Sequence, residues 1–213
     1  MGKKYNFYAG PAILPEEVLS QLQAEMVDFH GSGLSLVETS HRSKEYDAVH
    51  NDAISTFRSL FSVPDSYEIL LLGGGATLQF GMVPLNFLSG GSCDFTLTGA
   101  WAKKALADAK KVGDVQLLFD GSKSDFTTLP DPNSLTPRAA ARYLHITSNE
   151  TIGGVQWKTF PNTGEVPLIA DMSSDILSRP VDISPFGLIY AGAQKNLGPA
   201  GVTVVIIRKE MMD

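Results

Sequence analysis

One lysine directly follows one of the most apolar runs of the chain, and its amine could act as a nucleophile. Residues 188–193 read Leu-Ile-Tyr-Ala-Gly-Ala, and Gln194 and Lys195 come directly after them. Partial burial among these small and apolar residues would lower the pKa of the lysine toward that of a usable amine nucleophile. The alternative is a solvated surface lysine, which is the ordinary state of this residue type.

An aspartate occupies the same position after another apolar run. Residues 167–170 read Pro-Leu-Ile-Ala and lead into Asp171. A carboxylate at the end of a buried strand needs a partner, because burial of an unpaired charge is costly. The ordinary alternative is a cap for a helix that begins after Ser173. A metal site built from Asp171 and Asp175 is disfavoured, since no histidine is near either of them in the sequence.

A glycine-rich turn suggests a binding site for phosphate. Residues 73–77 read Gly-Gly-Gly-Ala-Thr, after an apolar run and before a predicted helix. Bare backbone N–H groups at the start of a helix, together with the helix dipole, bind phosphate well. The alternative is a tight turn in which Thr77 caps the helix. A P-loop and a dinucleotide site are both excluded, because the turn lacks Gly-Lys-Ser/Thr and the glycine spacing differs.

The elements around these residues alternate between strands and helices. Apolar spacing predicts helices over 15–29, 43–61, 77–88 and 101–112, and strands over 68–72, 95–97, 115–119, 143–147, 166–170, 188–191 and 202–207. Residues 120–138 are predicted to be a long surface loop. This alternation indicates an α/β fold, with a mostly parallel sheet and helices on both faces. The lysine, the aspartate and the glycine turn then meet beyond the strand ends, as pyridoxal phosphate requires.

Composition excludes several other classes of protein. The chain has 213 residues and a net charge of −6, which disfavours nucleic acid and anionic membranes as partners. Its single cysteine, Cys93, excludes a disulfide framework and suits the cytoplasm. We expect no secretory signal, because no apolar stretch follows the first lysines, and no membrane span, because the longest apolar runs are far too short.

Five segments spread along the chain resemble the phosphoserine aminotransferase family. They read NFYAGPA over 6–12, SHRS over 40–43, GGGATLQF over 73–80, TSNETIGG over 147–154 and AGAQKNLGPAG over 191–201, in the order that the family has them. The set is specific, although each motif alone is not. The resemblance implies a pyridoxal 5'-phosphate enzyme with the aspartate-aminotransferase fold.

The resemblance also implies roles for the residues around the cofactor ring. Lys195 would join the cofactor aldehyde and later move the proton between the substrate Cα and the cofactor. Asp171 would keep the pyridine nitrogen protonated, which makes the ring a better electron sink. Trp101 would stack on the ring, and Thr151 would lie against the ring hydroxyl. Without the resemblance, Trp101 is equally well explained as a core anchor, and Thr151 is better explained as a turn residue before Gly153 and Gly154.

The remaining roles concern phosphate and substrate. By resemblance, Ala76 and Thr77 would bind the cofactor phosphate through backbone N–H groups, and Gln194 would reach the same phosphate. Arg42 would hold a substrate carboxylate through a bidentate pair, and His41 would help with the anionic groups of the substrate. Taken alone, Arg42 is an exposed residue before a helix and His41 is a loop histidine.

The resemblance further implies a reaction and a domain organisation. L-glutamate and 3-phosphohydroxypyruvate would be the substrates, with O-phospho-L-serine and 2-oxoglutarate as products, in a homodimer. Residues 1–15 would join a small domain, and residues 16–213 would form an incomplete large domain, with the C-terminal small domain lying outside this chain. Two alternatives stay open: a catalytically silent fragment that binds a phosphate ligand, and another enzyme of the same fold. A cysteine desulfurase fits less well, because Cys93 lies far before Lys195.

Overall fold

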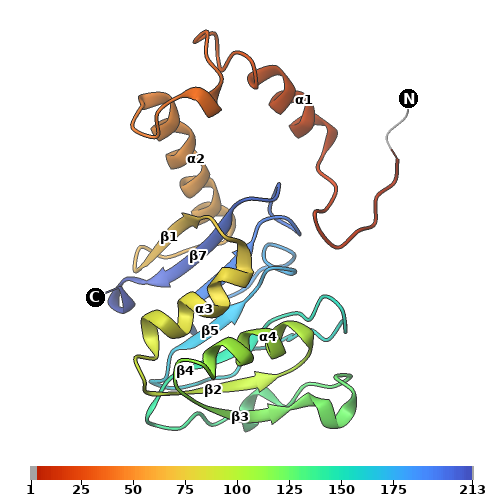
Figure 1. Ribbon diagram of the computed structural model, residues 1–213, viewed down its shortest axis with the longest axis vertical. Helices are drawn as coiled ribbons and strands as arrows, with labels where there is room; N and C mark the ends of the chain where they lie inside the picture. Colours follow the sequence, from red (N-terminus) through yellow and green to blue (C-terminus); the bar gives the residue numbers. More distant parts are fainter. Residues whose placement is uncertain (1–3, 213) are drawn as a thin grey trace.

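The computed structural model describes residues 4–212, and its centre is a seven-stranded sheet (Figure 1). The strands lie side by side in the order β1-β7-β6-β5-β4-β2-β3. Their bounds are β1 Tyr67–Leu72, β2 Ser92–Leu97, β3 Asp114–Asp120, β4 Ala141–Thr147, β5 Leu168–Asp171, β6 Phe186–Gly192 and β7 Thr203–Arg208. All seven predicted strands are therefore confirmed, with ends that differ by a few residues.

Six of the seven strands point in the same direction. β7 is antiparallel to both of its neighbours, β1 and β6, and every other neighbouring pair is parallel. Leu72 of β1 and Gly192 of β6 both lie opposite Thr203, so these two strands end at the same level. The carboxyl ends of six strands thus share one edge of the sheet, where ligands of α/β proteins bind.

Two helices cover one face of the sheet. α3 (Gly75–Phe87) and α4 (Ala100–Ala109) follow β1 and β2, respectively, and pack on each other and on the sheet (Figure 1). α4 buries Ala102, Ala105, Leu106 and Ala109, which recur at helical spacing along one side. The three alanines of this set allow the helix to approach the strands closely.

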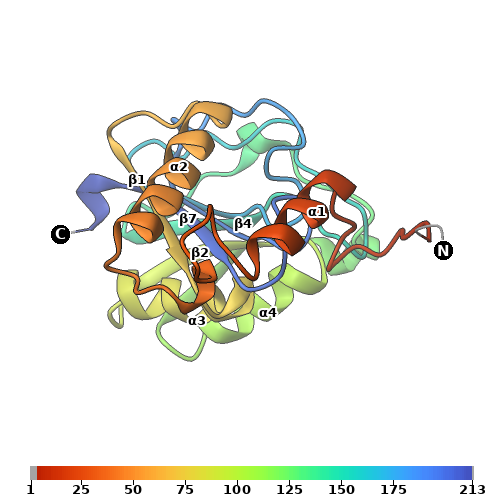
Figure 2. The ribbon, with the colours of Figure 1, turned by 90° about the horizontal axis from the view of Figure 1, so that it is seen from above.

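The other face is covered partly by a helix and partly by irregular chain. α2 (Lys44–Leu60) packs its second half there through Ile54 and Phe57, on the side opposite α3 and α4 (Figure 2). Trp157, Met172 and Ile176, from the long connections after β4 and β5, complete this core. Helices on both faces are confirmed, and the α/β fold class with a mostly parallel sheet is confirmed with them.

The N-terminal part of the described chain lies outside these layers. α1 (Glu16–Glu25) buries none of its residues, and the chain before it is extended (Figure 1). The predicted helix over 15–29 is too long, because turns replace the helix from Met26 onward and His30 has a positive φ of 52°. Among residues 4–212, no helix is long and apolar enough to cross a membrane.

Short 3-10 helices occupy several connections. They are η1 Leu36–Glu38, η2 Gly121–Ser124, η3 Pro132–Ser134 and η4 Lys209–Met211. Two of them fall within 120–138, which otherwise lacks regular structure apart from the end of β3, as predicted. The alternative in which Thr77 caps a helix is wrong: the N-cap is Gly74, whose φ of 92° favours glycine, and α3 begins at Gly75.

Candidate active site

The amine of Lys195 lies at the shared strand edge, between a hydroxyl and an aromatic ring. Lys195 follows β6, and its Nζ donates a hydrogen bond of 2.6 Å to Oγ1 of Thr151, which follows β4. The same Nζ lies 4.9 Å from the centroid of the Trp101 ring, near the start of α4. Three predicted site residues, far apart in the sequence, are thus brought together.

Lys195 is half-buried, and this changes its acid–base chemistry. Burial lowers the pKa of Lys195, while the negative charges of Asp171 and Glu150 act in the opposite direction. A lysine in this setting loses its proton more readily than an exposed one, so it is suited to attack a carbonyl group.

Asp171 ends β5 and is only 5% exposed. Its Oδ1 accepts hydrogen bonds from the backbone N–H of Ser173 at 2.9 Å and from the Ser173 hydroxyl at 2.6 Å. Burial raises the pKa of Asp171, whereas the Ser173 hydrogen bonds and the charge of Lys195 lower it. The capping alternative is wrong, because turns and no helix follow Ser173. Within residues 4–212, no group of three or more His, Cys, Asp or Glu residues is placed to hold a metal ion.

Glu150 is a functional candidate that the sequence reasoning missed. Its carboxylate is completely buried and accepts hydrogen bonds from the backbone N–H groups of Trp101 at 3.0 Å and Ala102 at 2.9 Å. It directly precedes Thr151 in the sequence and connects that segment to the start of the helix that carries Trp101. The available signal was a charged residue only three positions after the apolar run over 143–147.

The predicted phosphate ligands also follow strands that end at this edge. Ala76 and Thr77 lie in the first turn of α3, where backbone N–H groups have no acceptor within the helix. Gln194 follows β6, and its backbone carbonyl accepts a hydrogen bond of 2.8 Å from Ala12. The donor set therefore contains helix N–H groups and a side-chain amide, which suits a phosphate. The three assignments stay predictions.

His41 and Arg42 are not brought to the lysine by the described contacts. Both are exposed, in the turn before α2, and their side chains make no hydrogen bond or ion pair with residues 4–212. Their assignment to the substrate stays a prediction.

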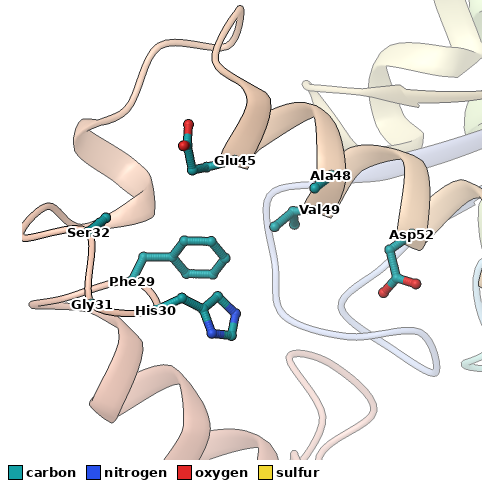
Figure 3. Close-up of a pocket in the computed structure, with 8 residues that line it drawn as sticks. All are labelled: Phe29, His30, Gly31, Ser32, Glu45, Ala48, Val49 and Asp52. Atoms are coloured by element: carbon teal, nitrogen blue, oxygen red, sulfur yellow. The ribbon is translucent and has the colours of Figure 1, made fainter.

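Two pockets flank the N-terminal segment. One, of about 370 Å³, lies between residues 12–18 and residues 195–199 and includes Lys195 in its lining. The other, of about 590 Å³, lies where Phe29 and His30 face Val49 and Asp52 of α2 (Figure 3). None of the predicted site residues lines this second pocket, so the first is the one associated with the lysine.

Comparison with known proteins relates this chain to aminotransferases. The family model described as Aminotransferase class-V matches residues 4–213. A protein of Halalkalibacterium halodurans named phosphoserine aminotransferase is 53% identical over 100% of this chain and 59% of its own length. A protein of Niallia circulans with the same name is 53% identical over 99% of this chain and 58% of its own length.

Solved structures give the same result. The phosphoserine aminotransferase from Bacillus circulans subsp. alkalophilus matches with a TM-score of 0.95 and 52% identity, over 98% of this chain and 58% of that structure. The structure from Trichomonas vaginalis is described as phosphoserine aminotransferase with bound pyridoxal phosphate. It matches with a TM-score of 0.92 and 39% identity, over 99% of this chain and 63% of that structure. The chain thus spans about 59% of the length of the curated relatives that it matches.

Proposed function

Because this chain belongs to the class-V aminotransferase family, we propose that it carries the cofactor site of a pyridoxal-phosphate-dependent aminotransferase. The proposed reaction moves the amino group of L-glutamate to 3-phosphohydroxypyruvate and yields O-phospho-L-serine and 2-oxoglutarate, a step of serine biosynthesis. The choice of substrates rests on relatives that are named phosphoserine aminotransferase and are 53% identical to this chain.

The observation that carries this proposal is the environment of the Lys195 amine. The amine is half-buried, bonded to Thr151 at 2.6 Å and placed 4.9 Å from the Trp101 ring centroid. A surface lysine that serves only solubility would lack this burial and the lowered pKa that follows from it, and an aromatic ring alone does not mark the site, since the exposed Lys104 lies 4.4 Å from the same Trp101 centroid.

The residues present fit pyridoxal phosphate. Asp171 uses Oδ1 for Ser173, and no described residue donates a hydrogen bond to its Oδ2. This oxygen suits the protonated nitrogen of the pyridine ring, and a positive charge there would favour the ionised carboxylate. When bound, the cofactor supplies an aldehyde for the lysine and a ring that accepts electrons from the substrate Cα. Ala76, Thr77 and Gln194 would hold its phosphate.

The side chains of this site would divide the work of binding and proton transfer. The indole of Trp101 provides a flat apolar surface that shields one side of the site from water. Thr151 holds the Lys195 amine by its hydroxyl and thereby limits the directions in which Nζ can point. The neutral amine of Lys195 then accepts the proton from the substrate Cα and returns it later.

Substrate, partners and location complete the proposal. Arg42 and His41 would bind the anionic groups of both substrates from the exposed turn before α2. We place residues 16–213 in a cofactor-binding domain, residues 1–15 with a small domain, and two copies of the protein in a homodimer. The buried thiol of Cys93 fits the reducing cytoplasm.

The test is a direct assay for the product. The chain is incubated with pyridoxal phosphate, L-glutamate and 3-phosphohydroxypyruvate, and O-phospho-L-serine is measured by mass spectrometry. We expect product with the wild-type chain and with Lys110→Arg, an exposed lysine on the end of α4, and none with Lys195→Arg. Equal product from both variants would contradict the role of Lys195, and no product from any sample would favour a catalytically silent fragment.

A further inference from the structure

The completely buried carboxylate of Glu150 has an unusual set of partners. It accepts hydrogen bonds from the backbone of Trp101 and Ala102, and at 3.4 Å from the hydroxyl of Thr98. All three donors come from the end of β2 and the first turn of α4, about fifty positions before Glu150 in the sequence. A buried charge with these donors is well compensated, because hydrogen bonds to a carboxylate are strong and the helix start is positive.

The start of α4 is built to receive this carboxylate. The N-cap residue is Gly99, which has no side chain to accept a hydrogen bond from the helix. A Cβ at position 99 would lie 2.6 Å from Cδ of Glu150, so only glycine leaves room for the carboxylate. Glu150 therefore replaces the cap that residue 99 does not supply. The helix thus begins without a capping side chain at its own N-cap position.

The same short segment holds the lysine. Thr151, the next residue, accepts the hydrogen bond from Nζ of Lys195. The segment is itself fixed to the chain that follows β5, since Ser148 bonds to Asp175 and Asn149 donates to Ser174 at 2.8 Å. The segment after β4 thus contacts the three segments that follow β2, β5 and β6.

We propose that Glu150 is a positioning residue that fixes the indole of Trp101 against the amine of Lys195. The backbone N–H of Trp101 is one of its two close partners, so the carboxylate determines where the first turn of α4 places the ring. The consequence for cofactor binding rests on the proposed function, whereas the position of the ring does not.

A glutamine at position 150 removes the negative charge but keeps almost the same side-chain shape. Its amide oxygen can accept one of the two backbone hydrogen bonds, while its amide NH2 would face the other N–H as a second donor. Glu150→Gln should therefore release one side of the first turn of α4 and move the indole. Gly99→Ala should also move the indole, because the added Cβ would push the Glu150 carboxylate away from the first turn of α4. The carboxylate keeps its negative charge in this variant.

The experiment uses the chain labelled with 5-fluorotryptophan, without cofactor. The two tryptophans give two fluorine resonances, and Trp101→Phe assigns them. We expect Glu150→Gln and Gly99→Ala to shift the Trp101 resonance more than that of Trp157, whose ring is buried in the core on the other face although its backbone N–H donates to Ser148 of the same segment. Glu165→Gln, which changes an exposed glutamate, is the matched control and should change neither resonance.

A second measurement connects the ring position to the cofactor. Borohydride labelling of Lys195 is followed while the concentration of pyridoxal phosphate is raised. Half-maximal labelling should need about tenfold more cofactor in Glu150→Gln than in the wild type. This factor corresponds to the loss of one hydrogen bond to a charged group. Glu150→Asp, which keeps the charge, should recover part of this loss.

The outcomes separate this inference from the proposed function. An unshifted Trp101 resonance in both folded variants overturns the inference. If both resonances collapse to the unfolded position in Glu150→Gln, the shift in Gly99→Ala decides instead, and its absence overturns the inference. If the wild-type chain takes no label at Lys195 while the Trp101 resonance still shifts, the positioning role stands and the proposed function fails.

Discussion

The amine of Lys195 is set apart from the surface lysines by its surroundings. Burial lowers its pKa, and the negative charges of Asp171 and Glu150 limit the fall. We expect Lys195 to become reactive toward acetic anhydride at a lower pH than the exposed Lys110. Asp171→Asn removes one of the two opposing charges, so it should further lower the pH at which Lys195 reaches half of its full reactivity, the midpoint of its acetylation.

Competitive acetylation at a series of pH values, followed by peptide mapping, measures both midpoints in one sample. Asp65→Asn, a change at an exposed aspartate, is the control and should leave the midpoint of Lys195 unchanged. A midpoint for Lys195 at or above that of Lys110 would contradict the effect of burial.

A second buried group should make stability depend on pH. Nε2 of His145 lies 2.9 Å from the Tyr190 hydroxyl, its ring stacks on Phe95, and burial lowers its pKa to about 3. The unfolded chain therefore binds a proton below about pH 6.5 and the folded chain does not, so stability falls as the pH drops below that value. Between pH 7 and pH 5 this contributes a loss of about 2 kcal/mol.

Urea unfolding of the wild type and of His145→Gln at pH 7 and pH 5 measures this contribution. We expect the variant to lose about 2 kcal/mol less than the wild type over this interval. His50→Gln, which changes an exposed histidine of α2, should behave as the wild type does. An equal loss in wild type and His145→Gln would show that His145 titrates normally.

At the scale of elements, the start of α3 depends on one glycine. Gly74 has a φ of 92°, and a Cβ there would lie 2.3 Å from Cδ2 of Leu78. Gly74→Ala should destabilise the fold by about 1–2 kcal/mol, chiefly through the strained backbone. The neighbouring Gly73 has ordinary φ and nothing within 4 Å of a Cβ, so Gly73→Ala is the matched control. Equal denaturant midpoints for the two variants would contradict this account.

The strands could be predicted from the sequence, but the direction of one of them could not. Continuous apolar runs identify strands that are buried on both faces, and β4, β5 and β6 follow this pattern. The run over 202–207 is equally apolar, yet β7 is antiparallel to both of its neighbours. Burial on both faces determines composition and not direction, so direction depends on the connections.

The first helix shows a different limit of sequence reasoning. Apolar residues at helical spacing predict that it continues to Phe29, but α1 ends at Glu25 and buries nothing. The carboxylate of Asp28 accepts a hydrogen bond of 2.7 Å from the backbone of Gly33, which stabilises a turn in place of another helical turn. Local side-chain bonds of this kind compete with a helix and are hard to recognise in a sequence.

At the scale of the whole molecule, some residues of the site could be placed from the sequence and others could not. Lys195 and Asp171 could be predicted together because parallel strands end at one edge of the sheet, whereas Thr151 is indicated only by the family resemblance. Glu150 could not, since its role depends on the close approach of Gly99, which follows the neighbouring strand β2 but lies about fifty positions earlier in the sequence. Arg42 belongs to an exposed turn outside the layers. Its positive charge can be recognised in the sequence, but its distance from Lys195 cannot.

We propose that Lys195 is the one lysine of this chain that binds pyridoxal phosphate covalently. The chain is incubated with the cofactor, reduced with borohydride, digested and analysed by mass spectrometry for the reduced adduct. We expect one label per chain, confined to the peptide that contains Lys195, and no such label in Lys195→Arg. A label spread over exposed lysines, or no label on Lys195 in a folded chain, would contradict the account.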